Sequence, residues 1–315
     1  MSTHQLLTAF LCLLLGSAVP AGLKAQEIKT DKRLEESLHD VLKDFNGIAG
    51  VYVYHLKTKK EAGVNADTIF PTASIVKIPI LVGVFDKIHQ GELSYHQPLV
   101  YHDSIKYGGS GLMQFFKDST STDLSLLSAL MITYSDNTAS LWNQQLAGGG
   151  SRINKIMESY GFKHTRVNSR TPGREKDWQK YGWGQTTPRE MATLLLKIRQ
   201  GEIVSTTASE EMYRLMTNVY YDDYALSQIP PYIQTASKQG MVDASRSELV
   251  MVNATHGDYV FYIATKDNVD VRWNYDNESW ELARKISALL WDYFEPKSEW
   301  KPATGSEKLQ DGFAY

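Results

Sequence analysis

A serine and a lysine lie three residues apart in the otherwise apolar stretch FPTASIVKIPIL, which spans residues 70–81. On a helix, this spacing brings the side chains of Ser74 and Lys77 onto the same face. Ser74 falls at the start of the predicted helix, where the partial positive charge of the helix N-terminus favours an alkoxide. A lysine in a dry site has a lowered pKa, so the Lys77 amine can accept the serine proton and make Ser74 a nucleophile.

Two further motifs carry groups suited to the same chemistry. The tripeptide SDN at residues 135–137 follows a predicted helix, and KQG at residues 238–240 lies on the first of several late predicted strands. A Ser-x-x-Lys pair alone is a weak signal, because the two residue types often meet by chance. Three such motifs in this order are a specific signal.

Together the motifs resemble the SxxK, SDN and KTG signature of the penicillin-recognising serine enzymes, and most closely that of the class A β-lactamases. The resemblance covers roughly residues 30–295 and includes GGSGLMQ at residues 108–114 and QTTPREMATLL at residues 185–195. It implies a two-lobed fold and a serine hydrolase that works through an acyl-enzyme, with β-lactam hydrolysis as the leading activity.

The resemblance implies a role for each matching residue. Ser74 would be acylated by the substrate, and Lys77 and Ser135 would shuttle protons. The backbone N–H groups of Ser74 and Met241 would form an oxyanion hole, in which each donor stabilises the developing charge by roughly 2.7–4 kcal/mol. The expected substrate-binding residues are Tyr107, Asn137, Lys238, Gln239, Gly240 and Met241.

The sequence departs from the resemblance in the loop that should supply the base for deacylation. Class A β-lactamases use a glutamate there, but matching the flanking residues puts Thr171 at that position. Glu175 falls where the family has a water-binding asparagine, and we expect it as a substitute catalytic base. The alternative is that Glu175 and Asp177 are solvated charges of a Pro-Gly loop, since exposed carboxylates are the common case.

The KQG motif departs as well, because Gln239 replaces a threonine or serine. In the family that hydroxyl helps to hold a substrate carboxylate, and a glutamine amide is longer and differently oriented, so we expect altered carboxylate recognition. Arg246 is the nearest arginine behind this strand, offset by about one residue. The aromatic residues of the deacylation loop are expected to pack it against the helical lobe, with lining the pocket as the alternative. They are Trp178, Tyr181 and Trp183.

The composition excludes several other classes of protein. The 315 residues are 42% apolar and 22% charged, which suffices for a sizeable core. A formal net charge of −3 gives no basic field for binding nucleic acid. The eight histidines show no metal-ligand spacing, so we expect neither a metal nor a cofactor. The expected partner is a small molecule, a β-lactam or a cell-wall peptide, bound by a monomer.

Residues 1–25 predict a secretory signal peptide. Their segment LLTAFLCLLLGSAV is almost entirely apolar and short for a bilayer span. We expect a mature protein that starts near Gln26, in the periplasm or medium of a bacterium and without stable membrane insertion. An uncleaved anchor is the alternative. The only cysteine, Cys12, lies in this segment, so the mature chain would have no thiol for a nucleophile or a disulfide.

Hydrophobic periodicity predicts strands near both ends of the chain and helices in its middle. Apolar spacing predicts an amphipathic helix over residues 31–45, then strands at residues 48–56 and 61–70. Helices are predicted near residues 74–90, 124–131, 137–147, 151–160 and 187–200. Strands return at residues 233–239, 247–254 and 259–265, and a helix over residues 279–294 closes the fold.

We therefore predict an α+β fold of the β-lactamase/transpeptidase type, with an α/β lobe whose antiparallel sheet is flanked by helices and an all-α lobe. One catalytic domain spans residues 26–297. Its α/β lobe takes residues 26–73 and 231–297, its helical lobe residues 74–230, and residues 298–315 form a polar tail. The substrate site is expected in the cleft between the lobes.

Three functions fit these features. The first is a secreted serine β-lactamase that completes acylation and deacylation. The second is a related hydrolase of another amide or ester, such as a D,D-peptidase, with β-lactams as slow inhibitors. The third is a sensing or binding module that is acylated without turnover. The missing glutamate and Gln239 favour the second, whereas retention of the matching polar residues argues against complete loss of chemistry.

Overall fold

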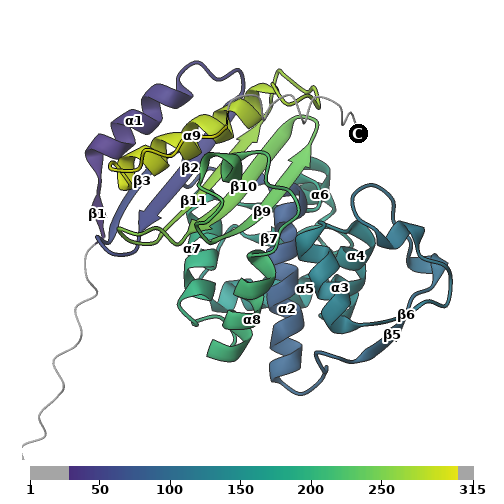
Figure 1. The fold of residues 1–315 in the computed structure, drawn as a ribbon. Coiled ribbons are helices and arrows are strands. Elements are labelled where there is room, and N and C mark those ends of the chain that lie inside the picture. Colours follow the sequence, from purple (N-terminus) through teal and green to yellow (C-terminus); the bar gives the residue numbers. More distant parts are fainter. Residues whose placement is uncertain (1–27, 304–315) are drawn as a thin grey trace, which may run out of the picture.

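A six-stranded sheet built from both ends of the chain forms one lobe of the protein (Figure 1). The computed structural model describes residues 28–303. The strand order is β1-β3-β2-β11-β10-β9, and all neighbours are antiparallel except β1 and β3. The strands are β1 (Lys29–Thr30), β2 (Ile48–His55), β3 (Lys60–Val64), β9 (Thr235–Val242), β10 (Ser245–Val252) and β11 (Tyr259–Lys266).

Two terminal helices cover one face of this sheet, and a third covers the other. Helix α1 (Lys32–Leu42) begins after Asp31, whose carboxylate accepts a hydrogen bond from the Leu34 N–H and so caps the helix. It buries Leu34 and Leu38, one turn apart, and packs beside α9 (Glu278–Phe294). Helix α7 (Pro188–Arg199) contacts β2, β10 and β11 from the opposite side.

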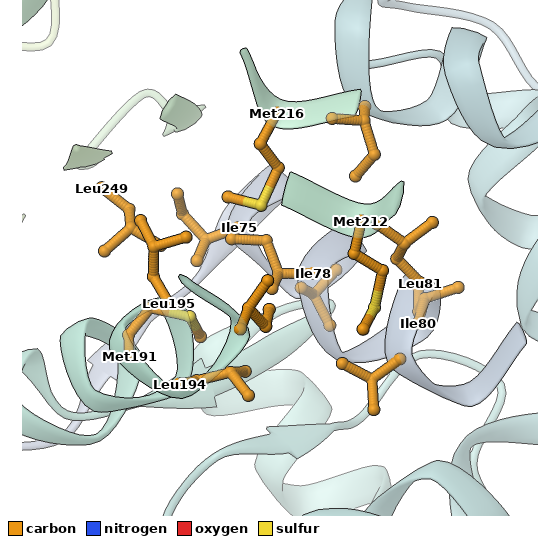
Figure 2. Close-up of a cluster of buried hydrophobic side chains, with 14 of the residues drawn as sticks. Ile75, Ile78, Ile80, Leu81, Met191, Leu194, Leu195, Met212, Met216 and Leu249 are labelled. Carbon is orange, nitrogen blue, oxygen red and sulfur yellow. The ribbon is translucent and has the colours of Figure 1, made fainter. Parts of the chain in front are cut away.

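The helical lobe is organised around α2 (Lys77–His89), whose residues from Lys77 to Phe85 are all buried. A helix that is apolar on every side belongs inside a protein, and α2 is contacted by α3, α4, α5 and α8. Figure 2 shows Ile78 and Leu81 of α2 among Met191 and Met212, which come from α7 and α8. The surrounding helices are α3 (Leu124–Thr133), α4 (Asn137–Leu146), α5 (Gly149–Ser159) and α8 (Thr206–Met216).

Short elements connect the two lobes. A three-stranded sheet has the order β4-β8-β7, and β5 pairs with β6. These strands are β4 (Phe70–Pro71), β5 (Pro98–Val100), β6 (Ser121–Asp123), β7 (Arg166–Val167) and β8 (Gly184–Thr186). The remaining helical turns are η1 (Ala73–Val76), η2 (Asp103–Ile105), η3 (Met113–Phe115), α6 (Glu175–Tyr181) and η4 (Ala225–Gln228).

The predicted α+β class is confirmed, with two local differences. The strand predicted over residues 61–70 ends at Val64, because Asn65 adopts a left-handed φ of +50° and turns the chain away. Helices α6 and α8 were not predicted, although Ser205 caps the start of α8. The predicted signal peptide, including Cys12, lies outside the described residues. No helix within residues 28–303 has the length and apolar character needed to cross a bilayer.

A carboxylate is buried inside the sheet lobe. Strand β10 has every residue buried, and Glu248 at its centre is fully inaccessible. Its two oxygens accept hydrogen bonds from the Ala225 N–H at 2.7 Å and the Ser237 hydroxyl at 3.3 Å. Burial nevertheless dominates and raises the pKa of Glu248 to about 8. The folded protein therefore holds this proton more tightly than the unfolded chain does.

We predict that the stability of the protein carries the pH signature of Glu248. Because its pKa is raised in the folded state, its contribution is full below the unfolded pKa of 4.5 and is lost as pH rises through about 8. Relative to Glu248→Gln, the wild-type protein should lose more than about 1 kcal/mol of unfolding free energy between about pH 5 and pH 8. Urea unfolding measures this. The exposed Glu36→Gln is the control, and an equal pH trend in both variants contradicts the prediction.

Candidate active site

Ser74 lies on η1, directly before the buried helix α2. Its side chain is half-buried, while Ile75 and Val76 after it are fully buried and anchor the turn in the core. The preceding Ala73 has a φ of +44°, in the left-handed region that a residue with a Cβ seldom adopts. The packed turn thus holds a strained backbone that presents the Ser74 hydroxyl to the cleft.

The Lys77 amine lies at the centre of the polar groups that the three motifs supply. Its Nζ lies 2.9 Å from Ser74 Oγ, 3.0 Å from Ser135 Oγ and 2.9 Å from Asn137 Oδ1. The Ser135 carbonyl is a fourth close acceptor. A neutral amine has two N–H groups and a lone pair, so it can donate to two of these oxygens and accept a hydrogen bond from one of the serine hydroxyls.

Burial favours the neutral form of both lysines. Lys77 is fully buried, and this desolvation, followed by the charge of Lys238, lowers its pKa well below the usual 10.5, while Asp136 opposes the shift. Burial also lowers the pKa of Lys238 to about 7, against the opposing charge of Glu248. The lowered pKa of Lys77 favours the neutral amine that a general base requires.

The SDN motif bridges α3 and α4. Ser135 is buried with a φ of +53°, and Asp136 caps α4 by accepting a hydrogen bond from the Ala139 N–H at 2.8 Å. Asp136 also accepts one from the Met113 N–H at 2.7 Å, so its carboxylate bonds backbone groups of two segments. Asn137 donates its amide to the Gly108 carbonyl at 3.1 Å. These bonds fix the loop that aims Ser135 at Lys77.

The edge strand β9 supplies the third motif. The Lys238 ammonium is fully buried and donates to Ser135 Oγ and to the Gln239 carbonyl, both at 2.9 Å. Gly240 lies against η1, where an added Cβ would be 2.3 Å from the Thr72 carbonyl oxygen. Only glycine allows this approach, which brings Met241 into the wall of the same cavity as Ser74.

Gln239 on β9 and Arg246 on β10 do not reach the cavity. Gln239 is buried, and its side-chain amide donates to the Tyr221 carbonyl, so the residue does not line the pocket for which it was predicted. The Arg246 guanidinium is also buried, stacks over Trp273 at 4.4 Å from the ring centroid and donates to the Asp243 carbonyl. It holds the turn between β9 and β10 and leaves no charge for the substrate.

A cavity of about 520 Å³ opens above Ser74. Tyr107 lies in its wall as predicted, with its ring 5.4 Å edge-to-face from Trp183. Tyr181 and Trp183 line the cavity rather than only packing the loop, whereas Trp178 is exposed. The lining residues are Pro71, Ala73, Ser74, Tyr107, Asn137, Lys180, Tyr181, Gly182, Trp183, Met241, Val242, Ala244, Ser245, Lys266 and Asp267.

The structure does not bring Glu175 to this cavity. Its carboxylate is exposed and accepts a hydrogen bond from the Gly173 N–H at 3.0 Å, at the start of α6. Thr171 is buried against Gly150 and donates its hydroxyl to the Ser169 carbonyl at 3.0 Å. Among the described lining residues the only carboxylate is that of Asp267, so the loop presents no evident base for a water beside Ser74.

The structure therefore brings together Ser74, Lys77, Ser135, Asn137 and Lys238, with Gly240, Met241 and Tyr107 beside them. Gln239 and Glu175 are outside this group. Sequence reasoning missed Lys180, Lys266 and Asp267 as lining residues. None of the three belongs to a recognised motif. Lys266 and Asp267 reach the cavity only because β11 lies beside β10 in the sheet.

The comparisons with known proteins agree with this geometry. The model described as the Beta-lactamase enzyme family matches residues 33–294. Beta-lactamase VEB-1 of Pseudomonas aeruginosa is 22% identical over 272 residues, which are 82% of this chain and 89% of that protein.

Solved structures share the fold. PBP-A has 26% identity and a TM-score of 0.75, over 85% of this chain and 98% of that one. A point mutant of PBP-A was solved as the acyl-enzyme complex with penicillin G. TLA-1 extended-spectrum beta-lactamase has 19% identity and a TM-score of 0.75, over 83% of this chain and 98% of that one, and this likeness concerns the fold alone.

We predict that Gly240→Ala pushes β9 away from η1. The added Cβ meets backbone, which cannot move aside as a flexible side chain can. The variant should lose about 1–3 kcal/mol of unfolding free energy, and its labelling by a fluorescent penicillin should slow by about tenfold or more. The control is Gly108→Ala in the loop that Asn137 bonds, because the added Cβ would meet nothing closer than 3.7 Å. Equal labelling rates in the two variants contradict the prediction.

Proposed function

Because the chain belongs to the beta-lactamase enzyme family, we propose that this β-lactamase-like serine hydrolase acts through an acyl-enzyme at Ser74 on a β-lactam or a cell-wall peptide. The 2.9 Å contact between the fully buried Lys77 amine and Ser74 Oγ carries the proposal. It supplies both a nucleophile and the base that activates it. The acyl-enzyme of a PBP-A mutant with penicillin G supports the same intermediate here.

Acylation follows from the hydrogen-bond network. Ser74 Oγ attacks the carbonyl carbon, and its proton passes to the Lys77 amine. As the carbon–nitrogen bond breaks, Ser135, 3.0 Å from Lys77 and 2.9 Å from Lys238, delivers a proton to the leaving nitrogen and recovers one from Lys77. Asn137, which lines the cavity, assists by substrate binding, and the buried Lys238 assists by the positive charge that it can place beside Ser135.

The developing oxyanion requires donors that are fixed before the reaction. We assign this role to the backbone N–H groups of Ser74 and Met241, since Gly240 allows β9 to approach η1 and both residues line the cavity. Tyr107 and Trp183 form the wall opposite β9, where they shield the acyl group from bulk water.

Deacylation lacks an evident base. Thr171 offers a hydroxyl bonded to the Ser169 carbonyl, and Glu175 faces solvent. General-base catalysis typically contributes about 10²–10⁴-fold, so the acyl-enzyme should be long-lived with β-lactams. This favours the second candidate, a D,D-peptidase-like or other amide or ester hydrolase that β-lactams inhibit, and it leaves the acylated sensor as a third.

The cellular setting belongs to the same proposal. The apolar segment within residues 1–25 supports export to the periplasm or medium, with a catalytic domain over residues 26–297 that works as a monomer. Its two lobes, at residues 26–73 with 231–297 and at residues 74–230, would then meet at the cavity above Ser74. The intact mass of the exported protein tests whether the chain is cleaved near Gln26. Recovery of the full-length chain from the membrane fraction would contradict cleavage and export.

We predict that Ser74→Ala abolishes covalent labelling by benzylpenicillin and leaves the fold intact. Within residues 28–303, Ser74 is the only hydroxyl that both lines the cavity and contacts Lys77, since Ser135 is buried. The mass of the intact protein before and after incubation gives the result directly. Parallel hydrolysis of a chromogenic cephalosporin separates turnover, a persistent adduct and absence of reaction. An adduct of the same mass on the alanine variant would show that Ser74 is not the acylated residue.

We also predict that Glu175→Gln leaves the adduct lifetime within about threefold of wild type, as Asp177→Asn should. The reason is that Glu175 bonds Gly173 at the surface and does not line the cavity. Thr171→Glu should lower stability first, because Thr171 is packed on Gly150. A chase of the penicillin adduct by mass spectrometry gives the lifetimes. A lifetime about 10²-fold longer in Glu175→Gln alone would restore Glu175 as the base.

A further inference from the structure

The cavity extends past Ser74 toward the turn that joins β9 and β10. Lys238 and Val242 lie four residues apart on β9, about 13 Å along an extended strand. Ser245 is the cross-strand partner of Val242, and the register of β10 with β11 continues from the Ser247–Ala264 pair to put Ser245 beside Lys266. Lys266 therefore lies at the end of the cavity away from Lys238 and Ser135.

This far end is the acyl side of the proposed reaction. The leaving nitrogen must lie near Ser135, which delivers its proton, so the acyl substituent points along β9 beyond Met241. Met241, Val242 and Pro71 line that path with apolar surface, and the Val242 side chain is 49% exposed. A short chain of methylene groups can be buried there.

Two opposite charges lie where this path ends. The Lys266 ammonium donates to the Ile69 carbonyl at 2.9 Å and packs 5.1 Å from the Phe70 ring centroid, which holds it in place with N–H groups to spare. Asp267 follows it with a φ of +55° and is exposed. Within residues 28–303, neither side chain makes an ion pair, although both line the cavity.

A second accessible cation lines the same cavity. Lys180 on α6 lines the cavity, is exposed and lies 4.9 Å from the Tyr181 ring centroid. Helix α6 and strand β11 both contact β4, so the elements that carry Lys180 and Lys266 meet at one short strand of the cavity wall. Lys77 and Lys238 are fully buried in the proton-relay network and add no accessible charge.

We propose that this end of the cavity is a subsite for a zwitterionic amino-acid head group on the acyl side of the substrate. Lys266, with Lys180 across the cavity, binds the carboxylate, and Asp267 binds the ammonium. The apolar path along Met241 and Val242 takes the methylene chain that links the head group to the scissile carbonyl. The assignment of acyl side rests on the proposed function, whereas binding of the head group is a property of the cavity itself.

The test uses three cephalosporins with the same nucleus and acyl chains of matched length. The aminoadipyl compound carries both charges, the adipyl compound keeps the carboxylate and lacks the amine, and the hexanoyl compound carries neither. Their dissociation constants are measured by calorimetry on the Ser74→Ala protein, so no covalent step is needed. We expect the aminoadipyl compound to bind about tenfold or more tightly than the hexanoyl compound, with the adipyl compound between them.

Variants made in the same background assign each charge. Lys266→Met should raise the dissociation constants of the aminoadipyl and adipyl compounds by about tenfold and leave that of the hexanoyl compound unchanged. Asp267→Asn should weaken the aminoadipyl compound alone. Lys266→Arg, which keeps the charge, should keep the order of affinities, and Lys155→Met, at an exposed site on α5, should change nothing. A loss shared by all three compounds in Lys266→Met would reveal a merely structural role.

Equal affinities for the three compounds, or no binding of any, overturn the subsite. Preference for the adipyl compound, with no effect of Asp267→Asn, overturns the zwitterion and leaves a plain anion site. Labelling of the wild-type protein by benzylpenicillin, which has an uncharged acyl chain, tests the proposed function separately. Labelling without discrimination among the cephalosporins would leave the acyl-enzyme standing and remove only the subsite.

Discussion

The burial of one amine constrains the whole arrangement of the active site. Lys77 has no contact with water, so its Nζ must find partners within the protein, and all three of its partner residues lie on polar motifs. Those partners come from η1 and from the loop between α3 and α4, and Lys238 on β9 reaches the same Ser135 hydroxyl. Strained backbone at Ala73 and Ser135 persists because this packing fixes it.

The parts of the site that sequence predicted are those set by short-range geometry or by the resemblance. The three-residue spacing of Ser74 and Lys77 places them together on any helical turn. The structure does not support Glu175 as the catalytic base. Its carboxylate accepts a hydrogen bond from the Gly173 N–H, two residues earlier in the loop, and this local contact could not be predicted from the sequence. The sequence could not predict that Lys266 and Asp267 line the cavity, because their position depends on the order of strands in the sheet. Hydrophobic periodicity predicted the layers of the fold. It did not predict the end of β3 before Asn65 or the start of α8 after Ser205.

Gln239 shows how a changed motif residue can reshape a site without entering it. The side-chain amide of Gln239 donates to the Tyr221 carbonyl. The Tyr221 hydroxyl lies 3.2 Å from Ser110 Oγ. The backbone carbonyl of Ser110 in turn accepts a hydrogen bond from the Asn137 N–H. Strand β9 is thereby tied to the SDN loop. The described cavity extends from Tyr107 and Asn137 past Ser74 toward Val242. Lys238 is fully buried beside Ser135, whereas Lys266 lines the cavity.

The central position of β2 in the sheet has a consequence for how the chain folds. Strand β2 pairs with β3, its neighbour in sequence, but its other edge pairs with β11, about two hundred residues later. Contacts of such high sequence separation slow folding, because the long intervening loop must close before they form. During synthesis, β2 would leave the ribosome with one hydrogen-bonding edge exposed until the last strands emerge. Lys238 lies on β9, which joins the sheet through β10 and β11, so the site around Ser74 can assemble only after β11 has been synthesised.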